Sequence, residues 1–260
     1  MAALLWAAPA PAGPPRDPVT KCAPDAVVAG TVCMDKYEAS VWRVPNPTAA
    51  NAALVKKIKG GKATQADLLA GGATQLGLVH GDYAPCAPNG ENCVNDIYAV
   101  SLAGIMPSNY ATWFQAQAAC ANAGKRLPTN AEWQVAADGT PDPGPDNGTT
   151  DCNTASSLSA PVNTGSRSNC KSARGAFDMV GNMTEWVAEW VPLSTTCPGW
   201  GSFSDDGNCF AGADTVRTEG PGVLVRGGGS GDDTAAGPLT VSAFFGPTLF
   251  GYGIGFRCAR

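Results

Sequence analysis

The stretch AGKRLPTNAEWQVAA, residues 123–137, carries the clearest local signal in the chain. Thr129 is a preferred N-cap residue, and Glu132 stands three positions later, where its side chain can complete a capping box. Trp133 and Ala136 then follow at helical spacing and give one apolar face. The sequence therefore predicts a short amphipathic helix that begins at Thr129 and packs against a core.

Working outward, the run NYATWFQAQAACANA at 109–123 also has helical spacing and stops at Gly124. Residues 28–44 are rich in β-branched and aromatic residues and predict one or two strands of a hairpin. A long irregular loop is predicted at 138–171. Short strands are expected at 184–191, 223–226 and 255–258. Two helices with short strands and large loops predict a loop-rich α+β domain.

The chain of 260 residues can bury one large core, and we expect a single domain at 26–260. Residues 1–25 are interpreted as a leader or a disordered tail rich in Ala and Pro. The apolar stretch at 2–12 resembles a signal peptide that lacks the usual basic residue before it. A surface insertion is expected at about 45–105, and a variable region at about 226–260.

Within the insertion, a short helix is expected near residues 64–70, and four lysines form a basic patch that we interpret as a solvated face: Lys56, Lys57, Lys59 and Lys62. The composition as a whole is that of a globular protein, with 44% hydrophobic and 15% charged residues. The net charge of −5 argues against nucleic-acid partners. No apolar run approaches the roughly 20 residues that cross a bilayer.

Ten cysteines are spread singly along the chain, and the sequence contains one histidine. Disulfides are therefore favoured over a zinc site, and they imply an oxidising compartment, so we expect a secreted, periplasmic or cell-surface protein. Short intervening loops favour four local pairs, while other pairings stay open. These local pairs are Cys22–Cys33, Cys86–Cys93, Cys152–Cys170 and Cys197–Cys209.

Four separated blocks resemble the formylglycine-generating enzyme, or sulfatase-modifying factor, domain. They are AGKRLPTNAEWQVAA at 123–137, GAFDMVGNMTEWV at 175–187, VRGGG at 225–229 and GFRCAR at 255–260. The resemblance implies a disulfide-stabilised, C-type-lectin-like fold. It also implies a Cys120–Cys258 disulfide.

The same resemblance bears on catalysis. The family enzymes oxidise a cysteine with two copper-binding cysteines between the RGG and GFR motifs, whereas this chain has none between Phe210 and Arg257. Cu(I) needs soft thiolate ligands. A related branch uses iron held by histidines, and His80 alone cannot form such a site. We therefore expect no catalytic residue, and neither copper nor iron.

The segment between Gly227 and Phe256 has a restricted alphabet, because Lys, Glu, Gln, Met and Trp are all absent from it. None of these five residues has a codon ending in C or T. Restoring Asn at eight positions gives AGPLTVNANNGPTNNNNNIGFRCAR. This resembles the variable proteins of diversity-generating retroelements, in which the adenines of a template are miscopied. The resemblance implies a non-catalytic binding protein with a hypervariable end, framed by fixed residues such as Gly237 and Gly255.

The ligand of such a protein is expected to be an unknown protein or cell-surface molecule read by residues 229–253. Exposed aromatic anchors among small polar residues are typical of antibody paratopes. An alternative is that FFGPTLFGYGIGF is a core strand of a structural domain. The predicted contact residues are Ser230, Asp232, Asp233, Ser242, Phe244, Phe245, Leu249, Phe250 and Tyr252.

A structural calcium site is also implied by the resemblance. The segment that matches the family's calcium site contains Asp178, Gly181, Met183 and Glu185, of which the two acids would bind through their side chains and the other two through backbone carbonyls. Its two acids are hard oxygen ligands of the kind that Ca²⁺ prefers. The alternative is that these acids serve as an ordinary N-cap and a surface charge.

Overall fold

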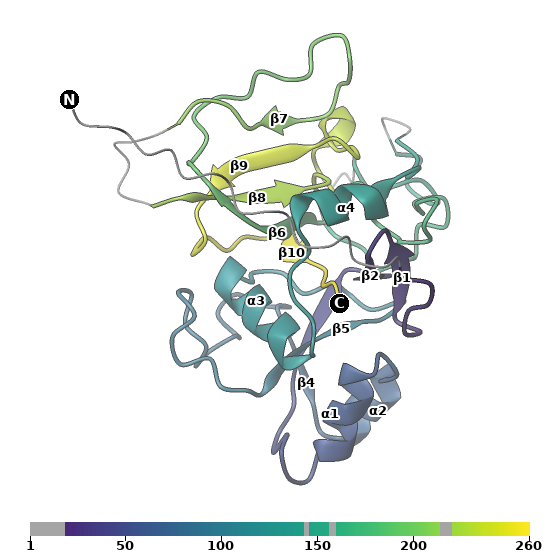
Figure 1. The fold of residues 1–260 in the computed structure, drawn as a ribbon, viewed down its shortest axis with the longest axis vertical. Helices are drawn as coiled ribbons and strands as arrows, with labels where there is room; N and C mark the ends of the chain where they lie inside the picture. The colour runs from purple at the N-terminus through teal and green to yellow at the C-terminus, as the bar shows by residue number, and fades with distance from the viewer. Residues whose placement is uncertain (1–18, 143–145, 156–159, 214–219) are drawn as a thin grey trace, which may run out of the picture.

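Two β-sheets lie one above the other in Figure 1, with the C-terminal residue between them. This computed structural model describes residues 19–142, 146–155, 160–213 and 220–260. In the described part, the larger sheet has the order β10 (Ile254–Phe256), β6 (Thr184–Val191), β8 (Gly222–Arg226), β9 (Val241–Phe245) and β7 (Asn208–Cys209). The two outer pairs are parallel, and the inner pairs are antiparallel.

The smaller sheet places β3 (Ala39–Arg43) between β4 (Thr74–Leu76) and β5 (Ile97–Ser101), with antiparallel pairing on both sides. The predicted hairpin is formed by β1 (Ala26–Ala29) and β2 (Val32–Asp35). Residues 28–44 therefore supply strands to two sheets, one more strand than the sequence predicts.

Four α-helices lie in the described residues: α1 (Ala52–Lys59), α2 (Gln65–Ala70), α3 (Trp113–Asn122) and α4 (Asn130–Ala137). The predicted capping box of α4 is confirmed, because Thr129 and Glu132 each accept a hydrogen bond from the other's backbone N–H. Thr112 and Gln115 form a second capping box at the start of α3. Both helices therefore begin at side-chain caps that satisfy otherwise free N–H groups.

The main core lies between the two sheets and α3. Trp186 on β6 and Phe256 on β10 are fully buried there, beside Cys120 on α3 and Ile97 on β5. A second cluster lies under α4 around Trp133. The residues that the sequence assigns to the apolar face of α4 are thus buried, as predicted.

The segment predicted as an insertion carries its own small cluster, formed by α1 and α2 against Trp42 and Tyr98 of the smaller sheet. The predicted lysine face is exposed to solvent. The helix predicted near residues 64–70 is α2, with Thr64 as its N-cap. Unlike the exposed lysine face, β5 at the end of this segment is buried along its whole length.

All ten cysteines lie in the described part and form five disulfides, which confirms the four local pairs and the Cys120–Cys258 pair. The end of the predicted tail is attached to the fold at two residues. Cys22 forms a disulfide with Cys33, and Asp25 forms a salt bridge with Lys125. Residues 1–18, which include the predicted signal-like stretch, lie outside the described residues. In the part that is described, no helix has the length and apolarity needed to cross a membrane.

Candidate functional site

The predicted variable region follows a definite path in the fold. It leaves β8, forms a loop with a short 3-10 helix (Asp233–Ala235), returns as β9, and reaches β10 through a second loop at 246–253. This second loop lies between the larger sheet and α3 (Figure 1). The region thus presents three parts: the loop before β9, the strand β9, and the loop after it.

Backbone groups hold the loop at 246–253 in place. The backbone N–H of Tyr110 donates to the carbonyl of Gly251 at 3.2 Å, and that of Trp113 donates to the carbonyl of Pro247 at 3.1 Å. At the other end, the N–H of Thr184 donates to the carbonyl of Gly253 at 2.9 Å. Each of these bonds uses a main-chain atom of the loop. The conformation of the loop therefore depends little on which side chains it carries.

Side chains of this loop face solvent. The exposed fractions are 41% for Leu249, 38% for Phe250 and 55% for Tyr252. Phe250 packs on the ring of His80 at a centroid distance of 4.8 Å, and Tyr252 lies 6.0 Å from the ring of Tyr110. The predicted exposure of these three contact residues is therefore confirmed, and two rings from outside the variable region join them.

Each of the two interpretations of this stretch, an exposed contact surface and a core strand, holds for part of β9. Val241–Phe245 is indeed a strand of the larger sheet, and Val241 and Ala243 are buried. Phe244 is 37% exposed, whereas Phe245 packs edge-on against Trp186 at 6.4 Å. The core-strand alternative is thus correct for one face of β9 and incorrect for the loop that follows.

The predicted polar contact residues also differ in their exposure to solvent. Asp232 and Asp233 are exposed, and the Asp232 carboxylate accepts a hydrogen bond from the N–H of Gly229 at 2.7 Å. Ser230 is only 3% exposed, so its prediction as a direct contact is wrong. The tight turn after β8 directs it inward, which the local sequence does not reveal. Asp232, Ser242 and Phe245 line one cavity of about 220 Å³.

A second cavity, of about 190 Å³, lies at the outer end of the loop at 246–253. Phe250 forms one wall, and His80, Tyr83 and Tyr110 contribute rings from elsewhere in the chain. These three residues were not predicted from the sequence. The only available signal was the presence of a single histidine, because contacts between distant loops have no local spacing.

The predicted calcium residues have other partners. Both carboxylate oxygens of Glu185 accept hydrogen bonds from the Arg257 guanidinium, at 2.6 to 2.9 Å, and one also accepts from the Trp133 indole at 2.7 Å. The Arg257 guanidinium thus lies where a metal ion bound by the Glu185 carboxylate would have to lie. The Asp178 carboxylate accepts from the N–H of Gly165 at 2.7 Å.

The other two members of the predicted set are buried. Gly181 donates its N–H to the carbonyl of Gly227, and the N–H of Met183 donates to the Glu38 carboxylate at 3.0 Å. In the described residues, no group of three or more His, Cys, Asp or Glu side chains is arranged to hold a metal. The Glu185 carboxylate, with both oxygens already bound by the Arg257 guanidinium, therefore fits Ca²⁺ poorly.

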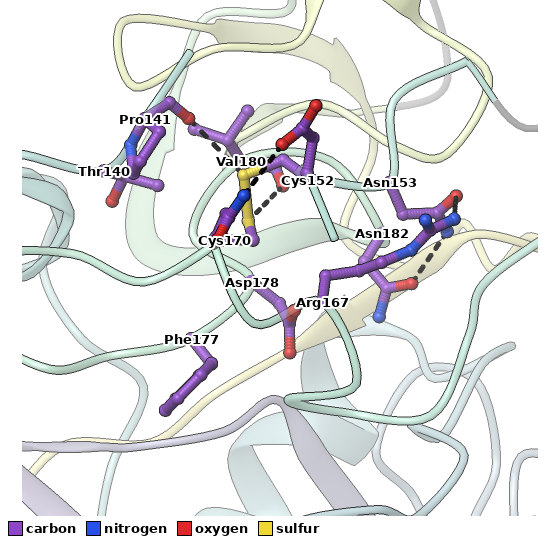
Figure 2. Close-up of a disulfide and its surroundings, with 12 residues drawn as sticks. Thr140, Pro141, Cys152, Asn153, Arg167, Cys170, Phe177, Asp178, Val180 and Asn182 are labelled. Carbon is purple, nitrogen blue, oxygen red and sulfur yellow. Dashed lines mark hydrogen bonds between the residues drawn. A yellow bond between two sulfur atoms is a disulfide. The ribbon is translucent and has the colours of Figure 1, made fainter. Parts of the chain in front are cut away.

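The loop that carries Asp178 is anchored by the Cys152–Cys170 disulfide (Figure 2). Asp178 is buried in a left-handed backbone conformation with φ of 58°. Burial raises the pKa of its carboxyl to about 6, although the nearby Arg257 opposes this shift. Burial, together with the charges of Asp178 and Glu185, also raises the pKa of Glu38 well above its usual value. These acids form a buried network around one arginine, away from the exposed loop.

The family model of the sulfatase-modifying factor enzyme 1-like domain matches residues 86–260, about two thirds of the chain. The chain belongs to this family. Its α+β architecture with five disulfides, together with this membership, confirms the predicted C-type-lectin-like fold of the formylglycine-generating-enzyme type. The matched range includes α3, α4 and the whole larger sheet.

Solved structures with a similar fold include the P3c variant of Major Tropism Determinant, at 17% identity and a TM-score of 0.47. The match covers 91% of this chain and 52% of that one, so the chain spans about half the length of this structure. PvdO from Pseudomonas aeruginosa matches at 19% identity and a TM-score of 0.38, covering 90% of this chain and 82% of its own. Treponema denticola variable protein 1 matches at 20% identity and a TM-score of 0.34, covering 60% and 71%. The comparison with curated proteins gives no match.

Proposed function

We propose that this family member is a non-catalytic ligand-binding protein whose C-terminal surface is made hypervariable by a diversity-generating retroelement. The main-chain hydrogen bonds of the loop at 246–253 carry the proposal. They fix the backbone, while Leu249, Phe250 and Tyr252 project into solvent. A surface can change its side chains without unfolding only if its backbone is held independently of them.

The glycines support the same division between fixed and variable positions. A Cβ at Gly237 would overlap the carboxylate of Asp206, and one at Gly255 would lie 2.5 Å from the Met183 methyl group. Both are among the residues expected to be fixed. A Cβ at Gly253 meets no atom within 4 Å, but its φ of 83° favours glycine and restricts change there. Positions 249, 250 and 252 are therefore less restricted than these glycines.

The ligand is proposed to be a protein or another cell-surface molecule. Three neighbouring apolar side chains at 249, 250 and 252 offer contact area of the kind that protein interfaces use as anchors. Five disulfides point to an oxidising compartment. We accordingly propose that the protein is secreted, periplasmic or displayed at the cell surface.

A formylglycine-generating oxidase is the second candidate, and membership of the family favours it. That chemistry uses a pair of reactive thiols. All ten cysteines of this chain are paired in disulfides, and none lies between Phe210 and Arg257. The binding function is therefore the better-supported proposal.

The test is to sequence the locus that encodes the chain. We expect a near-identical copy of the last hundred or so bases beside a reverse-transcriptase gene, with differences confined to adenines of the copy. The codons for residues 249, 250 and 252 should be among the differing positions. A locus with neither the copy nor the reverse transcriptase would refute the retroelement origin.

A further inference from the structure

The cavity beside Phe250 has two walls of different origin. One wall is Phe250 itself, at a position that the proposed function treats as variable. The other is the segment 80–88, which lies outside the variable region and carries His80, Tyr83 and Pro85. Tyr110 closes the space between them. A ligand group in this cavity would touch both walls at once.

The wall formed by residues 80–88 is fixed from several directions. The Asp82 carboxylate accepts the N–H of Gly77 at 2.8 and 2.9 Å, and the Arg43 guanidinium donates to the carbonyl of Tyr83 at 2.9 Å. The Cys86–Cys93 disulfide closes the far end of the segment. This wall is therefore preformed before any ligand arrives.

Two of the polar side chains that line the cavity, Tyr83 and Gln115, already have hydrogen-bond partners. The Tyr83 hydroxyl donates to the carbonyl of Asn109 at 3.2 Å. The Gln115 side chain donates to the carbonyl of Cys86 at 2.8 Å and accepts from the N–H of Thr112 at 3.0 Å. Neither Tyr83 nor Gln115 is free to pair with a charged or strongly polar group, and most of the other lining residues are apolar, so an apolar group is favoured.

Size and lining select a particular apolar group. The volume of about 190 Å³ exceeds the roughly 150 Å³ of an engineered cavity in another protein that holds benzene. Four rings border the space, those of His80, Tyr83, Tyr110 and Phe250. Aromatic rings attract one another through edge-to-face and offset contacts beyond the burial of area. A single six-membered aromatic ring satisfies both conditions.

We propose that this cavity takes one phenyl ring, supplied by a phenylalanine side chain of a protein ligand. The part that concerns ligand choice rests on the proposed function, because only then does the residue at position 250 differ between versions of the protein. Residues 80–88 give every version the same half-site, and residue 250 adjusts its width. Residues 80–88 thus supply a constant wall of the site, and the variable region supplies the wall that changes its width.

The experiment uses the untagged chain, in which His80 is the only histidine and gives isolated imidazole NMR signals. The probes are benzyl alcohol and cyclohexylmethanol, which differ only in ring saturation. We expect benzyl alcohol to shift the His80 signals saturably, with a Kd of about 1 mM. Cyclohexylmethanol should bind at least about threefold more weakly. No saturable shift, or equal binding of the two probes, would overturn the proposal.

Single substitutions test where benzyl alcohol binds. Phe250→Ala should weaken benzyl alcohol binding at least about threefold, whereas Leu69→Ala, which changes an exposed leucine of α2 outside the cavity lining, should leave it unchanged. Ala87→Leu should block the cavity from the constant wall. Each variant is first checked for an unchanged melting temperature. If Ala87→Leu does not fold, the comparison of Phe250→Ala with Leu69→Ala still decides, and equal effects of these two variants would contradict the site.

A second probe identifies the occupant. N-acetyl-phenylalanine methylamide carries main chain on both sides of its ring, and it should bind at least as well as benzyl alcohol. Binding of benzyl alcohol alone would show that the cavity serves free small aromatics, which would overturn the protein-ligand assignment. These results are independent of the locus. A missing template copy would remove the variability of residue 250 but leave the ring site measurable.

Discussion

Leu249 and Ile254 are isomeric aliphatic side chains five positions apart, and the structure assigns them opposite roles. Ile254 begins β10, is 7% exposed and packs in the main core. Leu249 is 41% exposed and lies in the loop before it. Replacing each with alanine therefore tests directly where the framework ends and the variable surface begins.

The expected costs follow from burial. Ile254→Ala removes buried methyl groups and leaves a cavity beside β6, so it should lower the free energy of unfolding by about 2–4 kcal/mol. Leu249→Ala should cost less than about 1 kcal/mol, because its side chain is already partly hydrated and no main-chain bond depends on it. The difference between the two variants should thus exceed about 1 kcal/mol.

Urea unfolding with the disulfides intact measures both costs under one set of conditions. Equal slopes with denaturant are required, so that a shift in midpoint reports stability alone. If Leu249→Ala costs as much as Ile254→Ala, the loop is part of the core. The reasoning that separates a fixed backbone from free side chains would then fail, and a structural domain would be the better account.

Four further outcomes are expected. Burial raises the pKa of Asp178 to about 6, so the folded state binds this proton more tightly than the unfolded state does. The stability that this proton contributes should therefore be complete below about pH 4 and be lost as the pH rises through 6, a loss on the order of 2–3 kcal/mol. In urea titrations at different pH values, Asp178→Asn should remove this part of the pH dependence. Replacing both Cys120 and Cys258 with alanine opens a 138-residue loop and should cost about 3–5 kcal/mol by the same assay. Asn109→Ala removes the acceptor for the N–H of Gly253 and should speed hydrogen exchange at that amide, whereas Asn109→Asp should preserve its protection. Because the Arg257 guanidinium already neutralises the Glu185 carboxylate, EGTA should leave the melting temperature unchanged, and a clear decrease would restore the calcium site.

Local signals predicted the elements that local chemistry controls. Thr129 and Glu132 marked the start of α4, and the alternating strand at 184–191 was placed with its observed bounds. By contrast, β5 was missed, although its run Ile97–Ser101 is uniformly apolar apart from one serine. A short run of this kind does not distinguish strand from helix by periodicity. It was masked further by the Gly-rich and Lys-rich segment before it.

The site could be predicted only in part, for a different reason. Codon reasoning indicated which positions can vary, and it found Leu249, Phe250 and Tyr252 correctly as exposed residues. It could not reveal that Ser230 is buried, because that depends on how the loop between β8 and β9 packs against the rest of the fold. Nor could it find His80, which reaches Phe250 from 170 residues away in the chain.

The geometry of the loop at 246–253 suits the proposed function, in which a variable surface must also bind tightly. One end is tied to α3 through Trp113, and the other to β6 through Thr184, before β10 continues into the Cys120–Cys258 disulfide. A loop fixed at both ends loses less conformational entropy when it binds than a free one does. Aromatic side chains add contact area with few rotatable bonds. Under the proposed function, each new version of the protein would inherit this preorganisation, because the bonds that hold the loop do not involve its side chains, and only the chemistry of its contacts would be selected.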